Sequence, residues 1–348
     1  MLHIDGSHGE GGGQILRTAV ALSVLTKTPL EINNIRAKRP NPGIKPQHYT
    51  AIKIMEKLCN AETDGLTIGS SNLIFSPGKI ISGNYHFDIG TAGSIMLVFQ
   101  AFILCLVRTN ATITLKVIGG TDVKWSPSWD YFKHVFLTLI NKIGFTVNVQ
   151  LIKRGYYPKG GGEVELTVKP CKDIKPLYLD KKQEFTTVEG IINIANLPDH
   201  ISKRMKHAAI KTLLNKNFDA RIKIEKTTSL SAGTGISLWT QTHDAILGTT
   251  TIGEKGLSAE KIGENVATEL IREVESGATL DIHALDQILP YLVLAKKNEK
   301  SLCIVREISN HSQTNMWLIR KFFSNQDIFN VENRNNLKIV KINGTGPL

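Results

Sequence analysis

The 348-residue sequence predicts an α/β (α+β) protein, with a core of three repeated units in pseudo-threefold packing and a smaller inserted α+β domain. Each unit is expected to contain two helices and a four-stranded sheet. The repeat is visible because one layout occurs three times: an apolar helix, a short polar turn, an alternating strand and a second, amphipathic helix. The insertion is visible because about a hundred residues that lack this layout interrupt the third copy.

The first helix and strand of the three copies are expected within residues 12–35, 92–118 and 284–305. The second helices follow at 47–58, 128–143 and 314–323, where apolar residues recur at the spacing of one helix face. Two more strands are predicted near 145–170 by alternating residues, and we assign them as the opening strands of the third copy.

The interruption predicts a division into a core, 1–181 and 278–348, and an inserted domain, 182–277. Within the insertion, strands are expected in TTVEGIINIANL, ARIKIEKT, GISLWTQT and AILGTTTIG, with helices in DHISKRMKHAAIKTLLNK and SAEKIGENVATELIREVESG. Insertion into a surface connection is tolerated because the ends of a compact domain often lie close together.

Composition narrows the functional classes. A formal net charge of +11 favours a polyanionic partner, because clustered Lys and Arg attract phosphates. The four cysteines contain no C-x-x-C pair, which opposes a structural zinc site or a disulfide framework and suits a reducing cytoplasm. The first residues lack the features of a secretory signal, and the apolar run 94–107 is shorter than the roughly 20 residues of a membrane span. We therefore expect a cytoplasmic protein with no membrane segment.

A glycine-rich segment, DGSHGEGGGQILR (5–17), directly precedes the first helix. Glycines let backbone N–H groups approach an anion, and the helix N-terminus adds partial positive charge. Arg17, one turn into the helix, favours a phosphate site. Glu10 is unusual in an anion cradle, so it either holds a divalent metal or is a solvated turn residue.

A basic segment follows in NIRAKRPNPGIKPQHYTAIK (34–53), where Arg36, Arg39 and Gln47 surround two X-Pro turns. The prolines stiffen the loop and reduce the entropy lost when its charges are held in place. The segment is either a solvated basic loop or a phosphate clamp built on arginine.

Two other features have both a structural and a functional interpretation. Gln100 is the strongly polar residue of an apolar helix, so its amide satisfies neighbouring backbone or contacts a ligand. The segment 119–132 carries Trp125, Pro127, Trp129 and Tyr131, which either sandwich a nucleobase or pack the loop.

The segments around His283 and His311 both begin helices. Asp281 or His283 lies near the first helix start, and an aspartate there is favoured as a cap. His311 is expected on the loop before the second helix, with Ser312 or Thr314 as the cap. That histidine is then either structural or free to act as a nucleophile.

Six segments together, DGSHGEGGGQILR, IRAKRPNPGIKPQH, GGTDVKWSPSWDY, RGYYPKGGGEVEL, HALDQILPYLVLA and HSQTNMWLIRKFF, closely resemble the RNA 3′-terminal phosphate cyclase family. The motifs run in order along the whole chain. The resemblance implies three repeated α/β units with an inserted domain. It also implies a ligase-type enzyme that uses ATP to convert an RNA 3′-phosphate into a 2′,3′-cyclic phosphate, releasing AMP and diphosphate.

The resemblance also implies roles for individual residues. His311, with Thr314 and Asn315, matches the family's His-x-x-Thr-Asn motif, which implies a covalent histidine–AMP followed by an RNA-adenylate. Residues matching its ATP site are Gln100, Pro127, Tyr131, His283, Ala284, Leu285, Asp286 and Gln287. His283 occupies a position where relatives often carry tyrosine. Residues matching its RNA-phosphate site are Arg17, Arg36, Arg39 and Gln47, and Glu10 matches an acidic residue near the metal, which would be Mg²⁺ or Mn²⁺.

The expected partners are therefore ATP and an RNA with a 3′-phosphate end, and the oligomeric state is left open between a monomer and a homodimer. One alternative is a catalytically silent relative that serves RNA assembly or ribosome maturation. Members of that branch lack the nucleophilic histidine, so His311 favours the enzyme. A second alternative, an enolpyruvyl transferase with a similar repeated fold, is disfavoured by the basic charge and the His-x-x-Thr-Asn motif.

Overall fold

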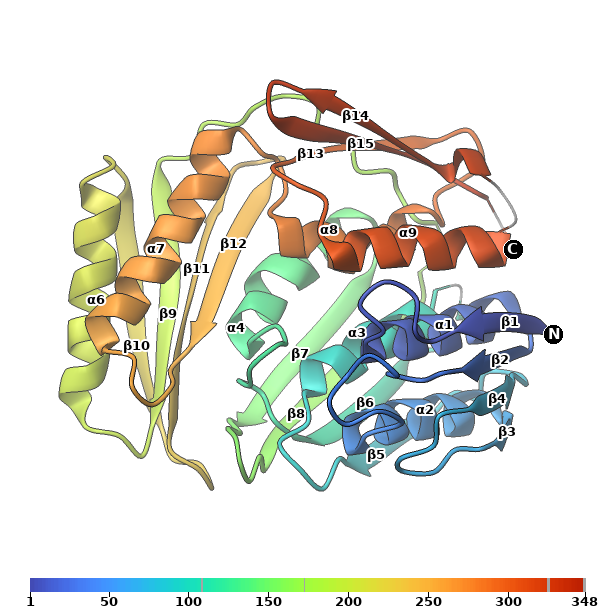
Figure 1. Cartoon of the computed structure of the whole chain (residues 1–348). Helices are drawn as coiled ribbons and strands as arrows, with labels where there is room; N and C mark the ends of the chain where they lie inside the picture. The colour runs from blue at the N-terminus through green and yellow to red at the C-terminus, as the bar shows by residue number, and fades with distance from the viewer. Residues whose placement is uncertain (108, 172, 324–325, 347–348) are drawn as a thin grey trace.

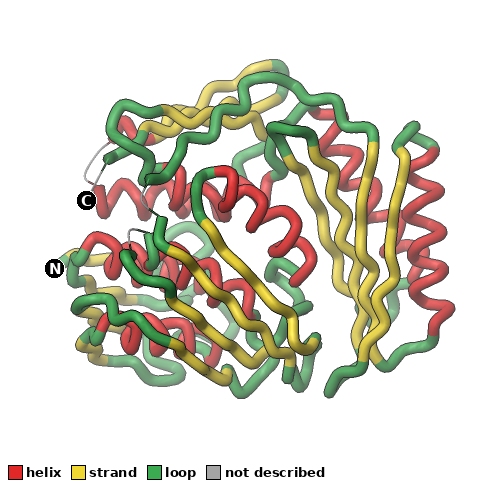
Figure 2. Tube along the Cα trace, turned by 180° about the vertical axis from the view of Figure 1, so that it is seen from behind, coloured by secondary structure: helices red, strands yellow, loops and turns green. Residues whose placement is uncertain are grey.

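A computed structural model of the protein describes residues 1–107, 109–171, 173–323 and 326–346. Within these ranges the chain forms four sheets, each packed with helices (Figure 1). The predicted α/β class is therefore confirmed. The first two core units share the order strand, helix, strand, helix, strand, strand, and the third lacks the opening strand. The insert forms a separate layer beside the core (Figures 1 and 2).

The first unit shows this order most simply. Its elements are β1 (Leu2–Asp5), α1 (Gly13–Thr26), β2 (Leu30–Asn33), α2 (Pro46–Cys59), β3 (Glu62–Asp64) and β4 (Leu73–Ser76). The sheet order is β1-β2-β4-β3, with β1 parallel to β2 and the other pairs antiparallel. Leu30 and Ile32 are buried while their neighbours in β2 are half-buried, so the alternation directs one face of the sheet onto the helices.

The second unit has the same sheet pattern, in the order β5-β6-β8-β7. Its elements are β5 (Asn84–Asp88), α3 (Ile95–Cys105), β6 (Ile113–Gly119), α4 (Trp129–Tyr131), the π-helical turn η1 (Phe132–Phe136), α5 (Leu137–Lys142), β7 (Thr146–Lys153) and β8 (Gly162–Lys169). Our assignment of the strands near 145–170 to the third copy is therefore wrong. They close the second sheet, because β8 pairs with β6 from Ile113↔Val168 to Gly119↔Gly162.

The third unit differs from the predicted four-stranded sheet. Its elements are α8 (Ile282–Leu292), β13 (Lys300–Val305), α9 (Asn310–Phe323), the 3₁₀ turn η2 (Gln326–Ile328), β14 (Phe329–Arg334) and β15 (Leu337–Asn343). Its three strands have the order β13-β15-β14. The place that β1 and β5 occupy in the other sheets is taken by one parallel bridge between Tyr178 and Leu302. The flanking residues have no extended pairing of their own, so alternation did not reveal them.

The insert contains every helix and strand expected for that segment. Its elements are β9 (Thr187–Ala195), α6 (Asp199–Leu214), β10 (Asp219–Thr227), β11 (Gly233–Gln241), β12 (Ile246–Ile252) and α7 (Ala259–Ser276). The sheet order is β10-β9-β11-β12. Its two helices cover the face turned away from the core (Figures 1 and 2). The two helices can pack closely because residue 263 is a glycine. A Cβ there would lie only 2.2 Å from the Met205 carbonyl oxygen.

Both connections to the insert run along the third sheet. Leu179 N–H donates to the Leu302 carbonyl at 2.7 Å, and Thr279 N–H donates to the Ile304 carbonyl at 2.8 Å. The Thr279 hydroxyl also donates to the Leu179 carbonyl at 3.3 Å. The chain therefore leaves and re-enters the core at neighbouring points of β13.

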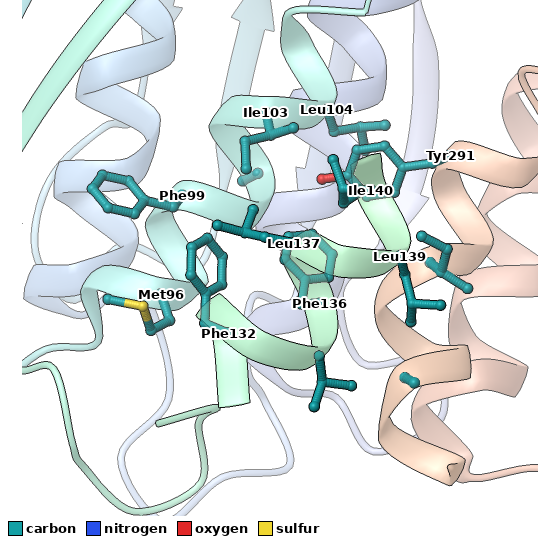
Figure 3. Close-up of a cluster of buried hydrophobic side chains, with 14 of the residues drawn as sticks. Met96, Phe99, Ile103, Leu104, Phe132, Phe136, Leu137, Leu139, Ile140 and Tyr291 are labelled. Carbon is teal, nitrogen blue, oxygen red and sulfur yellow. The ribbon is translucent and has the colours of Figure 1, made fainter. Parts of the chain in front are cut away.

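Apolar helices from different units form the centre of the core. Helix α3 is buried on nearly every side, as expected for a helix that is apolar around its whole circumference. Phe99 of α3 packs on Phe132, with ring centroids 6.1 Å apart, and Phe136 meets Tyr291 of α8 at 6.0 Å (Figure 3). The Tyr291 hydroxyl donates to the Gln100 carbonyl at 2.8 Å, which fixes α8 against α3. No helix among the described residues is long and apolar enough to cross a membrane.

A buried ion cluster joins the insert to the second unit. The Arg154 side chain is 2% exposed and lies 3.1 Å from the Asp122 carboxylate, 2.9 Å from that of Asp130 and 2.7 Å from that of Glu225. Asn193 of β9 donates to both aspartates. Burial raises the pKa of Asp130 to about 6, although the Arg154 charge acts in the opposite direction. Without the guanidinium, buried carboxylates would face one another unpaired.

Replacing Arg154 with methionine should lower the free energy of unfolding by about 3–5 kcal/mol, the usual cost of removing one partner of a buried ion pair. The loss should be smaller at pH 5 than at pH 8. Without the cation the folded-state pKa of Asp130 rises further, so its charge is removed as the pH falls. Urea unfolding at both pH values measures the effect.

Arg204→Met is the matched control, because Arg204 forms an exposed pair with Glu260 and such pairs contribute about 0–1 kcal/mol. Equal losses for the two variants, or a loss in Arg154→Met that grows at pH 5, would contradict this account of the cluster.

Candidate active site between the helices of the three units

A cavity of about 460 Å³ lies where helices of the three units meet. Its wall comes from α1, α3, α8 and α9, the loop before α4, and Thr250 of the insert. In Figure 1, α8 and α9 lie alongside α1 and α3. The wall includes eight of the residues to which the resemblance assigns catalytic, ATP-binding or RNA-phosphate-binding roles: Arg17, Gln100, Pro127, Tyr131, His283, Asp286, Gln287 and His311. Trp125 and Asn315, also named from the sequence, line it as well.

His311 lies in the first turn of α9 and not on a loop before it. The helix begins at Asn310, and the Ser309 hydroxyl accepts the N–H of Ser312 at 2.9 Å, so Ser309 is the cap. The expectation that Ser312 or Thr314 caps the helix is therefore wrong. Their hydroxyls are used elsewhere: Ser312 donates to the Asp286 carboxylate, and Thr314 donates to the Asn310 carbonyl at 2.8 Å.

The ring of His311 is oriented by Gln14, on the first turn of α1. The Gln14 side chain donates to the His311 carbonyl at 3.0 Å, so its oxygen is left to contact Nδ1 of the ring. Because an amide oxygen only accepts, this contact places the proton on Nδ1 and leaves the lone pair on Nε2. The side chain is 46% exposed, and Nε2 lies 3.7 Å from the Glu10 carboxylate. The His311 imidazole is therefore accessible and held in one orientation.

The glycine-rich loop brings Glu10 to this position. Gly9 has φ +56°, and a Cβ there would lie 2.6 Å from the Thr314 hydroxyl, so the loop contacts α9 closely only as glycine. His8 stacks on Trp317 of α9, with ring centroids 3.8 Å apart. The Glu10 carboxylate also pairs with Arg39 at 3.1 Å.

The donors near His311 suit a metal held mainly by a substrate. The described residues contain no group of three acidic, histidine or cysteine side chains that could bind an ion by themselves. Glu10 instead offers one half-exposed carboxylate beside the cavity. Mg²⁺ is commonly held by one or two carboxylates together with substrate phosphates, so this residue fits such an ion.

Positive charge gathers behind the glycine-rich loop. Burial and the charge of Arg36 lower the pKa of Arg17 to about 10, and burial and Arg39 lower the pKa of Arg36. Burial, followed by Arg17 and Arg36, lowers the pKa of His48 well below its usual value, so this ring stays neutral. Within the described part of the chain, no carboxylate pairs with Arg17 or Arg36. An anionic ligand would relieve the repulsion.

Asp281 caps the N-terminus of α8, whose residues His283, Asp286 and Gln287 line the cavity. Its buried carboxylate accepts the N–H groups of His283 at 3.1 Å and Ala284 at 2.9 Å, the Tyr131 hydroxyl at 2.7 Å and the Gly248 N–H at 3.0 Å. Burial raises the pKa of Asp281 and, more strongly, that of Tyr131. Tyr131 therefore keeps its proton and presents its ring to the cavity from a fixed position.

Polar groups of α8 face the cavity beside this cap. Asp286 accepts from Ser309 and Ser312, and it lies 3.9 Å from His283 Nδ1. The nearby Asp286 carboxylate raises the pKa of His283 against the effect of burial. Gln100 donates to the Gln287 side chain at 2.5 Å, and Gln287 donates to the His283 carbonyl at 2.9 Å. The Gln100 amide thus has Gln287 as its hydrogen-bond partner, and Gln100 also lines the cavity.

Six of the residues singled out from the sequence lie outside the cavity wall: Glu10, Arg36, Arg39, Gln47, Ala284 and Leu285. Ala284 and Leu285 are buried on the core face of α8. The Arg36 guanidinium donates to the Asn41 carbonyl at 2.6 Å, and the Gln47 side chain accepts the N–H of Ser94 at 3.1 Å. These two side chains already have protein partners.

Sequence reasoning assigned no role to Gln14 or Thr250. Gln14 is separated from His311 by 297 residues, and nothing in the local pattern links the two. Thr250 belongs to β12 of the insert. Nothing in the sequence of this strand indicates that its threonine reaches the cavity in the core.

The chain matches known proteins along nearly its whole length. Residues 8–327 match the family described as RNA 3′-terminal phosphate cyclase. Relatives named RNA 3′-terminal phosphate cyclase come from Methanosarcina mazei (42% identical over 340 residues, 92% of this chain and 95% of the relative) and Pyrococcus furiosus (43% over 323 residues, 93% of each). A third, from Methanococcoides burtonii, is 42% identical over 342 residues, covering 98% of this chain and 99% of the relative. This chain therefore belongs to the RNA 3′-terminal phosphate cyclase family of enzymes.

Proposed function

We propose that the protein is an ATP-dependent RNA 3′-terminal phosphate cyclase that acts through a covalent histidine–AMP intermediate. The main support is the position of His311. Its ring is oriented by Gln14, it lines the cavity, and its Nε2 lies 3.7 Å from Glu10. Glu10 in turn pairs with Arg39 of the arginine cluster, and Arg17 of that cluster also lines the cavity.

In the first step, the lone pair on His311 Nε2 forms a bond to the α-phosphorus of ATP. The bond from that phosphorus to the bridging oxygen breaks, and diphosphate leaves. The ring gains positive charge, and the Gln14 oxygen accepts its Nδ1–H, which stabilises the charge and keeps the ring in place. The product is a phosphoramidate.

The next two steps transfer the AMP and close the ring. An oxygen of the RNA 3′-phosphate attacks the AMP phosphorus, and the electrons of the N–P bond return to Nε2. The neighbouring 2′-OH then loses its proton to water and attacks the RNA phosphorus, and AMP leaves as the cyclic phosphate forms. Covalent catalysis thus replaces a poor leaving group with a good one.

We assign the ATP nucleoside to the part of the cavity between Pro127, Tyr131 and His283, with polar contacts from Gln100, Asp286 and Gln287. Ala284 and Leu285 would contribute indirectly, by anchoring α8 to the core. The flat, fixed ring of Tyr131 and the rigid Pro127 support a nucleobase at this end.

We assign the RNA 3′-phosphate to Arg17, Arg36, Arg39 and Gln47. Support comes from the lowered pKa values of Arg17 and Arg36, which an added anion would reverse. Arg39 would have to share its pairing with Glu10, and Gln47 would have to exchange its bond to Ser94.

Mg²⁺ or Mn²⁺ would be held by Glu10 together with the phosphates of ATP. Such an ion neutralises phosphate charge. Because Glu10 also pairs with Arg39, the carboxylate is kept at the boundary between the nucleotide and the arginine cluster.

The alternative function is a catalytically silent RNA-assembly or ribosome-maturation factor. It would have no use for an oriented, nucleophilic imidazole, so the Gln14–His311 contact favours the enzyme. A role in cytoplasmic RNA processing is part of the proposal, and the free cysteines, all buried, are compatible with a reducing compartment. A homodimer stays a prediction.

Incubation with ATP labelled at the α-phosphate should leave label on the wild-type chain. The label should survive alkali and be released by acid, as a phosphoramidate is, and His311→Asn should abolish it. His283→Asn is the matched control and should still label, because it removes a contact and not the nucleophile. Labelling of His311→Asn, with none in His283→Asn, would show that the wrong histidine has been assigned. Binding of RNA by a wild-type chain that never labels would favour the silent alternative.

Gln14→Leu should slow self-adenylylation by about 10–100-fold, the usual effect of losing a group that orients a reactive histidine. Gln14→Glu keeps the acceptor and should recover much of the rate. Its carboxylate still accepts the Nδ1–H and keeps the ring in place. Gln313→Leu, on an exposed position of α9, is the control and should adenylylate at the wild-type rate. A wild-type rate in Gln14→Leu would mean that Gln14 does not orient the reactive ring.

A further inference from the structure

Trp125 has an exposure that its surroundings do not explain. Its side chain is 96% exposed, whereas Trp129 and Trp239 are buried and Trp317 is stacked on His8. Full exposure forfeits the hydrophobic stabilisation that a buried indole provides. Since the other three tryptophans are buried or stacked, an indole left in water at one position indicates contact with a ligand.

The backbone at Trp125 adds a second unusual feature. Its φ is +60°, in the left-handed region, which is rarely occupied by a bulky residue and costs free energy. Held there, the side chain points away from the loop's own packing. Strain of this kind persists only where the surrounding structure enforces it.

The loop that carries Trp125 is firmly anchored on both sides. The Trp129 N–H donates to the Thr121 carbonyl at 3.0 Å, and the Ser126 hydroxyl donates to the Val123 carbonyl at 2.9 Å. Lys124 pairs with Glu254 of the insert. The exposed indole is thus presented by a fixed loop, which limits the entropy lost when a ligand stacks on it.

The position of Trp125 indicates which ligand it meets. Trp125 lines the rim of the cavity beside Ser126 and Pro127. The proposed adenine contacts, Tyr131 and His283, belong to the cavity wall, while almost the whole indole is in solvent. A mononucleotide can enter the cavity, but the body of a polynucleotide has to remain at its mouth.

We propose that Trp125 is a stacking platform for an unpaired nucleobase of the RNA end. This inference rests on the proposed function and adds a base-binding subsite outside the ATP site. Stacking tolerates different sequences because every base has a π-face, so the platform would hold RNA ends of many sequences while favouring unpaired ones. It would hold the RNA by a base, while the arginine cluster holds the phosphate.

Trp125→Ala should raise the KM for a 3′-phosphorylated oligonucleotide by about 5–100-fold, the range given by stacking of one base on an aromatic side chain. The KM for ATP should change less. Trp125→Phe keeps a stacking ring and should recover most of the affinity. Substrates with an abasic site at the last or the next-to-last nucleotide should identify the stacked base, because wild type and Trp125→Ala should then bind that substrate equally.

Tyr178→Ala is the matched control, since Tyr178 is 60% exposed and does not line the cavity. Its KM values should equal those of the wild type. Equal increases in the KM for ATP and for RNA in Trp125→Ala would assign the indole to the adenine of ATP and overturn the proposal. An unchanged KM for RNA would also overturn it.

Fluorescence separates this proposal from the proposed function. The emission of Trp125, taken as wild type minus Trp125→Phe, should be quenched by 3′-phosphorylated RNA without ATP and much less by ATP without RNA. Quenching by RNA in a protein that never forms histidine–AMP would support the platform while refuting the enzyme. A protein that forms histidine–AMP but shows no quenching by RNA would refute the platform alone.

Discussion

Asp281 accepts hydrogen bonds from four groups in three different parts of the chain. They are the Tyr131 hydroxyl in the second unit, the N–H groups of His283 and Ala284 in α8, and the Gly248 N–H in the insert. A buried carboxylate is costly unless such donors surround it, so the three segments stabilise one another through this residue. Tyr131, His283 and, two residues from Gly248, Thr250 all line the cavity. The shape of the cavity therefore depends on Asp281, which contacts no ligand in the proposed reaction.

The acidic groups around the cavity have hydrogen-bond donors, but two of the arginines near it have no carboxylate partner among the described residues. The acidic groups of α8 have donors, since Asp286 accepts from two serines and Asp281 from four groups. Arg17 and Arg36, in contrast, repel each other without a carboxylate partner among the described residues. His311 lines the cavity, and its Nε2 lies 3.7 Å from Glu10, which pairs with Arg39. A phosphate bound beside Arg17 and Arg36 would relieve the repulsion between these two cations. The fold therefore favours binding of an anion there before the ligand arrives.

Much of the fold could be predicted because helices and strands leave periodic patterns of apolar residues. The two strands near 145–170 were nevertheless assigned to the wrong sheet, because alternation shows which face is buried but not which strand is the neighbour. The start of α9 was misplaced because several adjacent polar residues are all good caps, and tertiary contacts of Ser312 and Asp286 select among them. The role of Gln14 depends on a contact across 297 residues, which no local pattern records.

The insert leaves and re-enters the core at Leu179 and Thr279, which bond to each other and to neighbouring carbonyls of β13. The two ends of the insert meet, so the segment between them could be gained, exchanged or lost in the gene without changing the register of the three core sheets. Its contribution to stability and to the cavity is a separate matter. Removing the insert would take away one donor to Asp281, one wall residue of the cavity and the Glu225 partner of Arg154. The insert is one continuous segment of the chain, yet the cavity and the ion cluster depend on contacts that it makes.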